Sequence, residues 1–347
     1  MKKYLFYIKH NYSFEVLRPL QAEIIRQGGK VAWFVEGDEI NLNYFNTNEK
    51  VIESVEEVFS YDPYATFVPG NMIPSFFAGF KVCVFYGFVG FKSRVKDNVN
   101  YHFIIRDCFD FYCTHGQSST TTFKELESKY RHFKTIETGY CKMDPYFNNT
   151  YPEKIKNSKP VILFSSTFSP RLTQAPRLLD TIAKLSQNKK WKWKVTFHPK
   201  MDINIVEAYK TIQHENLEFI ETDKLAPHII EADFMLGDNS SMITDFLLLE
   251  KPVVTFNNEA SQEYLHNITQ IEQVESAIEY ALGYPDKLMS SVRKFIQNTH
   301  PYKDGKSSLR VLEALNSLAS SFHESKSKPY NIIRNIKLRK NLNYGKF

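Results

Sequence analysis

Short apolar runs alternate with amphipathic stretches along most of the chain. Residues 4–8 (YLFYI) and 31–35 (VAWFV) are apolar runs of strand length, and they flank an amphipathic stretch at 13–29 that ends in Gly28-Gly29. A pair of glycines is typical of the residues that follow a helix, because glycine adopts the left-handed backbone conformation at low cost. The pattern predicts a β-α-β unit at the start of the chain.

The alternation of strands and helices continues in two series. In the first series, apolar runs of strand length occur at residues 65–68, 81–85, 110–114 and 135–139. In the second series, such runs occur at residues 161–166, 193–197, 217–220, 234–237 and 252–256, with helix-like stretches between them. Strands that alternate with helices are typical of a parallel sheet with helices on both faces. The chain is therefore predicted to be α/β, with a doubly wound sheet in each series.

The stretch at residues 141–160 separates the two series. It holds three prolines and a cluster of Asn, Lys and Asp without sustained periodicity, which indicates a linker. We expect the following division: an N-terminal domain at 1–145, a linker at 146–160, a C-terminal domain with closing helices at 161–325, and a basic tail at 326–347. Two such domains leave a cleft between them, and ligands of doubly wound sheets bind at the carboxyl ends of the strands.

Composition and motifs exclude several classes of function. The chain is 42% hydrophobic with a formal net charge of +5, a mild bias that suits an anionic small molecule, an anionic membrane surface or nucleic acid alike. The aromatic residues are spread through strand-like runs and form no basic-aromatic stripe, so we expect no nucleic-acid binding. Neither a Gly-x-Gly-x-x-Gly motif nor a Walker A motif occurs, which disfavours a dinucleotide oxidoreductase and a P-loop NTPase.

The cysteines and the N-terminus indicate the compartment. Cys83, Cys108, Cys113 and Cys141 include no Cys-x-x-Cys pair and lie mostly in strand-like runs. We therefore expect reduced core cysteines, a cytoplasmic protein and no zinc site. The apolar run near the N-terminus is too short for a signal peptide.

The C-terminal stretch at residues 326–347 is basic and contains no acid. Its lysines and arginines are interleaved with Ile332, Ile333, Ile336 and Leu338. This pattern is typical of an amphipathic helix that lies on an anionic leaflet, and also of a solvated terminus. The first interpretation places the protein peripherally on the inner face of the cell membrane.

Candidate chemistry is concentrated at residues 237–241 (GDNSS), between an apolar run and a helical one. Gly237 ends the predicted strand, and Asn239 or Ser240 can serve as the N-cap of the next helix, which leaves backbone amides near Ser241 unpaired. Unpaired amides, the helix dipole and two hydroxyls together suit a phosphate group. A helix cap that binds no ligand is the alternative interpretation.

Two acids and a histidine extend this site. Asp238 lies at the strand end, and Asp245 follows Ser241 by four positions on the same helix face. Carboxylates beside a phosphate are unfavourable unless they accept hydrogen bonds from ligand hydroxyls or bind a cation, so they suggest a nucleoside diphosphate ligand. His198 follows the run 193–197 at the same predicted edge, where it could bind a phosphoryl oxygen or protonate a leaving phosphate.

Five segments carry motifs of a known family. They are GYCKMDPYF (139–147), VILFSSTFSPR (161–171), VTFHPK (195–200), IIEADFMLGDNSSMITDFLLLEKPVVTFNN (229–258) and DGKSSLRVLEAL (304–315). Together they resemble the CDP-glycerol glycerophosphotransferases of teichoic-acid and capsule synthesis, over roughly residues 80–315. One difference is Ser166, which stands where that family usually has a proline before the threonine, here Thr167.

The resemblance implies a GT-B fold, in which two Rossmann-like doubly wound domains face a central cleft. The C-terminal domain would hold the donor, and the acceptor would enter from the N-terminal domain. The donor-binding residues that it implies are Thr167, His198, Asp238, Ser240, Ser241 and Asp245. Of these, His198, Ser240 and Ser241 would contact the donor pyrophosphate.

The N-terminal domain differs from the family at the expected base. A His-Gly pair followed by a lysine usually stands after a strand there, and the histidine is the proposed base for the acceptor hydroxyl. In this chain Tyr86 precedes Gly87, with Lys92 after them, so Gly87 and Lys92 are expected to bind the acceptor. Tyrosine, with a usual pKa of about 10, is a poor base at neutral pH. His115, at the end of another predicted strand, is a replacement candidate, and His102 is a weaker one.

The resemblance implies transfer of a glycerol-phosphate or related polyol-phosphate unit from a CDP-activated donor to a hydroxyl of a cell-surface glycan or polymer, with release of CMP. Catalysis would come from positioning and charge stabilisation. No tightly bound cofactor is implied, and a need for Mg²⁺ is left open. Two alternatives are a glycosyltransferase that uses a CMP-linked or other nucleotide-linked sugar, and a homologue that binds nucleotide or polymer without turnover because Tyr86 replaces the base.

Overall fold

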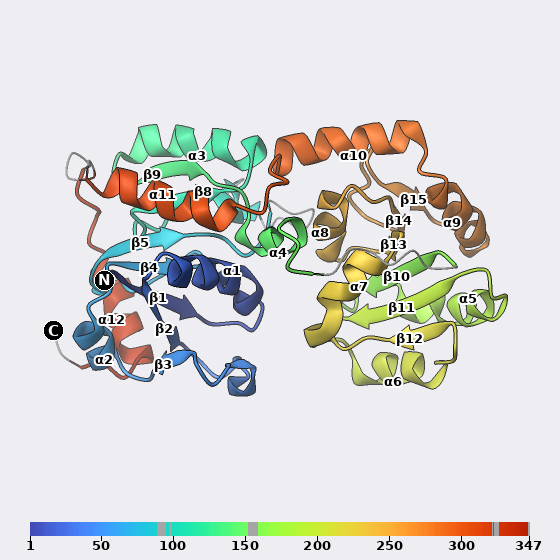
Figure 1. Cartoon of the computed structure of the whole chain (residues 1–347), viewed down its shortest axis with the longest axis horizontal. Helices are drawn as coiled ribbons and strands as arrows, with labels where there is room; N and C mark the ends of the chain where they lie inside the picture. Colours follow the sequence, from blue (N-terminus) through green and yellow to red (C-terminus); the bar gives the residue numbers. More distant parts are fainter. Residues whose placement is uncertain (89–94, 97–98, 152–158, 321, 323–325, 346–347) are drawn as a thin grey trace. The chain divides into compact units, whose positions relative to one another are not determined.

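The computed structural model describes residues 1–88, 95–96, 99–151, 159–320, 322 and 326–345 (Figure 1). The chain divides into two compact units, Met1–Asn148 together with Thr299–Phe347, and Asn149–Asn298. Within the described ranges, every helix is too short or too polar to cross a lipid bilayer.

A seven-stranded parallel sheet forms the centre of the first unit, in the order β3-β2-β1-β4-β5-β8-β9. Its strands are β1 (Lys3–Ile8), β2 (Lys30–Val35), β3 (Lys50–Ile52), β4 (Ala65–Val68), β5 (Phe80–Cys83), β8 (Phe111–Thr114) and β9 (Lys134–Glu137). Its first helices are α1 (Ser13–Arg26), α2 (Val55–Tyr61), α3 (Gln117–Tyr130) and the short α4 (Asp144–Phe147). The strand order reverses direction between β1 and β4, so the switch point of this sheet lies there.

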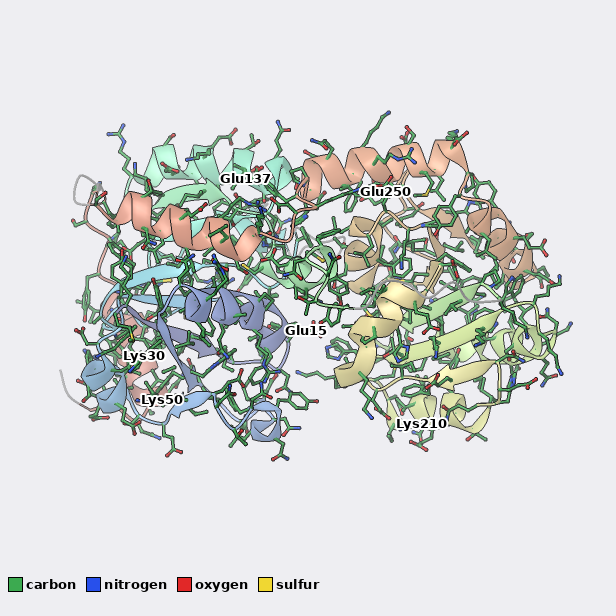
Figure 2. The ribbon with its side chains drawn as sticks, viewed as in Figure 1. Glu15, Lys30, Lys50, Glu137, Lys210 and Glu250 are labelled. Carbon is green, nitrogen blue, oxygen red and sulfur yellow. The ribbon has the colours of Figure 1, made fainter. Side chains whose placement is uncertain are left out.

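The direction of the strands separates two edges of this sheet (Figure 2). Lys30 and Lys50 begin β2 and β3 and mark the amino edge. Glu15 lies in the first turn of α1, directly after β1, and marks the carboxyl edge. The carboxyl edge is the one at which doubly wound sheets bind ligands.

The second unit is built on a six-stranded parallel sheet in the order β12-β11-β10-β13-β14-β15. The strands are β10 (Val161–Ser166), β11 (Lys192–Phe197), β12 (Leu217–Phe219), β13 (Phe234–Gly237), β14 (Val253–Phe256) and β15 (His266–Ile268). The helices are α5 (Ala175–Gln187), α6 (Ile203–Thr211), α7 (Leu225–Glu231), α8 (Met242–Leu248), α9 (Val274–Leu282) and α10 (Asp286–Thr299). Its switch point lies between β10 and β13. The predicted pair of doubly wound sheets is confirmed.

Burial on both faces explains the continuous apolar runs of the sequence. Every residue of β10 is buried, including the hydroxyls of Ser165 and Ser166 at its carboxyl end. Trp193 on the neighbouring β11 is 1% exposed, and Trp33 on β2 of the first unit is fully buried. The four cysteines are buried and unpaired, as expected of core residues.

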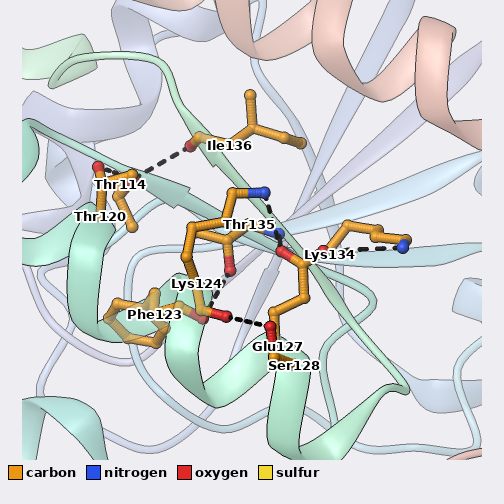
Figure 3. Close-up of polar contacts among 9 residues, drawn as sticks. All are labelled: Thr114, Thr120, Phe123, Lys124, Glu127, Ser128, Lys134, Thr135 and Ile136. Carbon is orange, nitrogen blue, oxygen red and sulfur yellow. Dashed lines mark hydrogen bonds and ion pairs between the residues drawn. The ribbon is translucent and has the colours of Figure 1, made fainter.

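Hydrogen bonds that involve threonines and the accepting carboxylate of one glutamate hold α3 against β8 and β9 (Figure 3). Glu127 of α3 accepts from the backbone N–H of Thr135 at 2.7 Å, and the Thr135 hydroxyl donates to the Phe123 carbonyl at 3.1 Å. The Thr114 and Thr120 hydroxyls are 2.7 Å apart. Because Thr114 ends β8, this network also fixes the loop that begins with His115.

The chain returns to the first unit for α11 (Ser307–Ala319), which is anchored by residues at the end of β9 and in α4. The buried carboxylate of Asp144 accepts from the backbone N–H groups of Ser307 and Ser308, at 2.8 and 2.7 Å. The Arg310 guanidinium donates to the Thr138 carbonyl at 2.8 Å. We refer to these five residues as the return clasp.

Gly139, the residue that follows Thr138, allows the start of α11 to lie close to the backbone after β9. Its φ is +83°, and an added Cβ would lie 2.6 Å from the Ser307 hydroxyl. The segments 139–147 and 304–315, which look like two separate family motifs, are therefore in contact with each other inside one unit.

The closing helices differ from the expected division of the chain. The sequence placed residues up to 325 in the C-terminal domain, whereas residues from Thr299 onward belong to the first unit. The physical reason is the return clasp, since α11 satisfies its first backbone amides with Asp144. In the described part of the tail, α12 (Ile332–Asn341) also packs on the first unit, where Asn335 and Leu338 are buried.

Candidate active site

The carboxyl edge of the second sheet brings together the predicted donor residues that lie on different loops. Thr167 follows β10, His198 follows β11 and Asp238 follows β13, and these three strands are neighbours in the sheet. The switch point between β10 and β13 lies among them. A ligand held at this edge could therefore contact all three loops.

Asp238 is a buried residue whose carboxylate links the loops of this edge through hydrogen bonds. Its carboxylate is fully buried and accepts from the Ser166 hydroxyl and from the backbone N–H groups of Thr167, Gln174 and Asn239, the bonds to Thr167 and Gln174 both measuring 2.9 Å. Burial raises the pKa of Asp238, and these hydrogen bonds oppose the rise. The sequence placed this acid in the donor pocket as an acceptor for ligand hydroxyls, whereas here its acceptor positions are filled by the protein.

The two serines lie where α8 begins. Ser241 is the N-cap, in place of Asn239 or Ser240, and its exposed side chain makes no capping hydrogen bond. The Ser240 hydroxyl accepts from the Met242 N–H at 3.3 Å and lies 3.5 Å from the Ser165 hydroxyl. The Ser241 hydroxyl is thus accessible to a ligand, while Ser240 is 8% exposed.

Asp245 belongs to the first turn of α8, four positions after Ser241, and is half-buried. Thr167 is 6% exposed, and its backbone N–H is one of the donors to Asp238. The Thr167 side chain therefore lies within the loop that Asp238 holds.

His198 is exposed, and its ring has a defined orientation. Its Nδ1 accepts from the backbone N–H of Lys200 at 3.0 Å, so in the neutral ring the proton is on Nε2. The exposed ring of Phe168 lies 4.4 Å from the imidazole, centroid to centroid, at 33°. Partial burial and the positive charge of Lys200 lower the pKa of His198. The lowered pKa favours the neutral ring, which offers one N–H donor, at Nε2, to an anionic ligand.

Two asparagines that the sequence did not indicate as site residues, Asn257 and Asn258, stabilise the same edge together with Asn239. The Asn258 amide donates to the Asp238 carbonyl at 2.5 Å, and the Asn257 amide donates to Gln174 Oε1 at 3.1 Å. Asn239 accepts from the Glu259 N–H at 3.2 Å. The signal in the sequence was the pair Asn257-Asn258 directly after a strand, the place where side chains reach the ligand edge.

Tyr86 and Gly87 lie on the carboxyl edge of the first sheet, after β5. The Tyr86 side chain is 51% exposed, and its ring lies 5.0 Å from that of Tyr12. An added Cβ at Gly87 would meet no atom within 4 Å, so the backbone there is open. Lys92, the other expected acceptor residue, lies outside the described residues.

His115, the replacement candidate for the base, is a core residue. It is 3% exposed, its ring packs 4.5 Å from that of Tyr140, and Nε2 donates to the Val84 carbonyl at 3.3 Å. Burial lowers its pKa to about 3. His102 is stacked on Phe85 at 4.7 Å, and burial lowers its pKa to about 4. Neither ring is placed to receive a proton from an acceptor hydroxyl at this edge.

The described residues contain no group of three or more His, Cys, Asp or Glu side chains arranged to hold a metal ion. The carboxylate of Asp238 could not serve as a cation ligand without giving up its protein donors.

Comparisons with known proteins agree with this architecture. A family model described as CDP-Glycerol:Poly(glycerophosphate) glycerophosphotransferase matches residues 105–317, more than half of the chain. A search of curated protein sequences found no match.

Solved structures show the same fold at low identity. The wall teichoic acid polymerase TagF matches with a TM-score of 0.66 and 12% identity, over 92% of this chain and 90% of that one. A putative UDP-N-acetylglucosamine 2-epimerase from Listeria monocytogenes matches with a TM-score of 0.64 and 13% identity, over 96% and 100%. S. aureus MnaA, in a co-structure with UDP, matches with a TM-score of 0.64 and 15% identity, over 95% and 100%. The predicted GT-B fold is confirmed.

Proposed function

Because the chain belongs to the CDP-glycerol:poly(glycerophosphate) glycerophosphotransferase family, we propose that it transfers a glycerol-phosphate or related polyol-phosphate unit from a CDP-activated donor. The acceptor is a hydroxyl of a cell-surface glycan or polymer, and CMP is released. The acceptor oxygen forms a bond to the β-phosphorus, and the bond from that phosphorus to the bridging oxygen breaks, so that CMP leaves with the electron pair.

The observation that carries this proposal is the fixed ring of His198 beside the switch point of the second sheet. Its Nδ1 is held by the Lys200 amide, so Nε2–H is the atom that binds a phosphoryl oxygen. Ser241 is exposed two strands away on the same edge, across β10. Donors aimed at the bridging and α-phosphoryl oxygens stabilise the charge that develops on CMP.

The remaining predicted donor residues take supporting positions in this proposal. Asp238 holds the loop that carries Thr167, and Asp245 lies one helical turn beyond Ser241. We assign Asp245 to the ribose or polyol hydroxyls of the donor, because a carboxylate beside a pyrophosphate is stable when it accepts hydroxyl protons. Tyr86 and Gly87 belong to the acceptor side, and no tightly bound cofactor is proposed.

A donor screen tests the proposed function. Release of CMP or UMP is measured with CDP-glycerol, CDP-ribitol, CMP-sialic acid and UDP-N-acetylglucosamine, each with and without Mg²⁺, and with glycerol as a soluble acceptor. We expect CMP from a CDP-polyol alone. Release from CMP-sialic acid would favour the glycosyltransferase alternative. Binding of CDP-glycerol by calorimetry without turnover, in both the wild type and Tyr86→His, would favour a binding homologue.

We also propose that α12 attaches the protein to the anionic inner face of the cell membrane. One face of the helix packs on the first unit, and the other presents Ile332, Ile333 and Ile336, which are 61%, 70% and 47% exposed. Lys337 and Lys340 are exposed on that same face. Isoleucines that enter the acyl boundary, beside lysines that meet anionic headgroups, suit an interfacial helix.

Co-sedimentation with vesicles tests this attachment. The wild type should bind vesicles that contain phosphatidylglycerol, and Ile332→Gln/Ile333→Gln/Ile336→Gln should weaken binding by about tenfold or more, because several buried methylene groups at about 0.8 kcal/mol each are lost. Ile203→Gln is a matched control, since Ile203 is 64% exposed on α6 of the second unit. Equal binding of the triple variant and the wild type would contradict the proposal.

A further inference from the structure

A histidine and a glutamate are paired at the carboxyl edge of the first sheet, in a place that the proposed donor site does not use. His10 follows β1, and Glu39 follows β2, the neighbouring strand. His10 Nδ1 lies 2.9 Å from Glu39 Oε2. Because β1 borders the switch point with β4, the pair lies where this sheet would bind a ligand.

The two loops that carry the pair are joined by further hydrogen bonds. Asn11 Oδ1 accepts from the Asn41 N–H at 2.8 Å, and the His10 carbonyl accepts from the Ser13 N–H at 3.0 Å. The first of these bonds links the His10 loop to the Glu39 loop, and the second links His10 to the start of α1. Glu15, which is labelled in Figure 2, lies in that first turn of α1.

The pairing determines which nitrogen of His10 can accept a proton. A carboxylate can only accept a hydrogen bond, so the neutral ring must carry its proton on Nδ1, and the lone pair lies on Nε2. In the described part of the chain, the hydrogen bond of this ring is the one to Glu39. The His10 side chain is 43% exposed, so an acceptor hydroxyl can reach it.

Tyr12 lies between His10 and Tyr86, the residue that stands in place of the expected base. The His10 ring lies 5.1 Å from that of Tyr12, which in turn lies 5.0 Å from the ring of Tyr86. Burial, together with the neighbouring Tyr86 and Glu39, raises the pKa of Tyr12, so Tyr12 remains protonated. This row of three rings therefore includes one group with an available basic lone pair, the imidazole.

We propose that His10 is the base for the acceptor hydroxyl and that Glu39 is its positioning residue. This inference rests on the proposed function and identifies the acceptor side of that reaction. The acceptor O–H proton moves to His10 Nε2 as the acceptor oxygen bonds to the β-phosphorus and CMP leaves. Glu39 then stabilises the imidazolium, which releases its proton to water.

The test compares variants of this pair with a matched pair elsewhere. With CDP-glycerol as donor and glycerol as acceptor, His10→Gln should lower kcat for CMP release by about 10²-fold or more, the usual contribution of a general base. Its Kd for CDP-glycerol by calorimetry should stay unchanged. His228→Gln should retain full activity, because His228 forms a similar pair with Glu231 at 3.3 Å on α7, a helix that precedes β13 and carries no predicted site residue. Wild-type kcat in His10→Gln would overturn the inference while leaving the proposed function intact.

A spectroscopic measurement tests the role of His10 without an acceptor. Nitrogen-15 shifts of the His10 ring should show the proton on Nδ1 in the wild type, and Glu39→Gln should reduce that population and lower kcat more mildly than His10→Gln. A wild-type ring protonated on Nε2 would overturn the inference, because Nε2 could then accept no proton. Failure of the wild type both to bind CDP-glycerol and to release CMP would instead count against the proposed function.

Discussion

Replacing His198 with alanine should lower CMP release from the CDP-activated donor by about 10²- to 10³-fold, the usual effect of removing one preorganised donor to a developing oxyanion. The imidazole enters the reaction already oriented, because Nδ1 accepts from the Lys200 amide. Its loss removes the one N–H that the ring offers to the leaving phosphate. Steady-state kinetics with purified protein give the measurement.

A series at position 198 separates hydrogen bonding from proton transfer. A glutamine amide can donate a hydrogen bond but cannot protonate the leaving group, so His198→Gln should recover part of the activity if charge stabilisation dominates. Lys200→Ala is the control, since it keeps the backbone N–H that orients the ring. Turnover near that of the wild type in His198→Ala would contradict the proposed role.

Replacing Asp238 with alanine should destabilise the second unit and abolish donor binding. Three backbone N–H groups and the Ser166 hydroxyl would lose a buried acceptor at once. Each unsatisfied buried group costs about 1–3 kcal/mol, so we expect a loss of about 3–5 kcal/mol in the free energy of unfolding, with local relaxation recovering the remainder. Urea unfolding followed by tryptophan fluorescence measures this, since Trp191 and Trp193 lie in that unit.

Two further variants test whether this loss of stability comes from the hydrogen bonds of Asp238. Asp238→Asn keeps the shape but turns an amide toward N–H donors, so it should lie between alanine and the wild type. Asp286→Ala, at an exposed position in the first turn of α10, should change stability by a few tenths of a kcal/mol. The assigned role of Asp238 would be wrong if Asp238→Ala unfolded at the same urea concentration as the wild type and bound CDP-glycerol equally well.

Local patterns predicted the sheets well, because a strand buried on both faces is apolar throughout. The run 161–166 coincides with β10, and the run 234–237 coincides with β13. The start of α8 was less predictable. The sequence allowed Asn239 or Ser240 as N-cap, but Asn239 is held by the Asn257 to Glu259 loop, and the helix begins one residue later.

Contacts between distant segments explain what the sequence could not show. Asp238 was expected to face a ligand, and its enclosure by the loop at 166–174 depends on contacts about 70 positions apart in the chain. His10 gave no signal by itself, since its partner Glu39 lies beyond a whole helix and strand. The family resemblance pointed to Tyr86, because Tyr86 stands at the motif position of the expected base. A motif cannot show that a ring on a neighbouring loop, here the proposed His10, supplies the base instead.

The return clasp sets the order in which the two units can be completed on the ribosome. All of residues 149–298 emerge before Ser307 and Arg310 do, so the second unit can close its sheet and core while the first still lacks α11 and α12. Domains usually finish folding in the order of synthesis. Here the first unit begins synthesis first but is completed last, when α11 is added. Until then the Asp144 carboxylate lacks the N–H groups of Ser307 and Ser308 as donors.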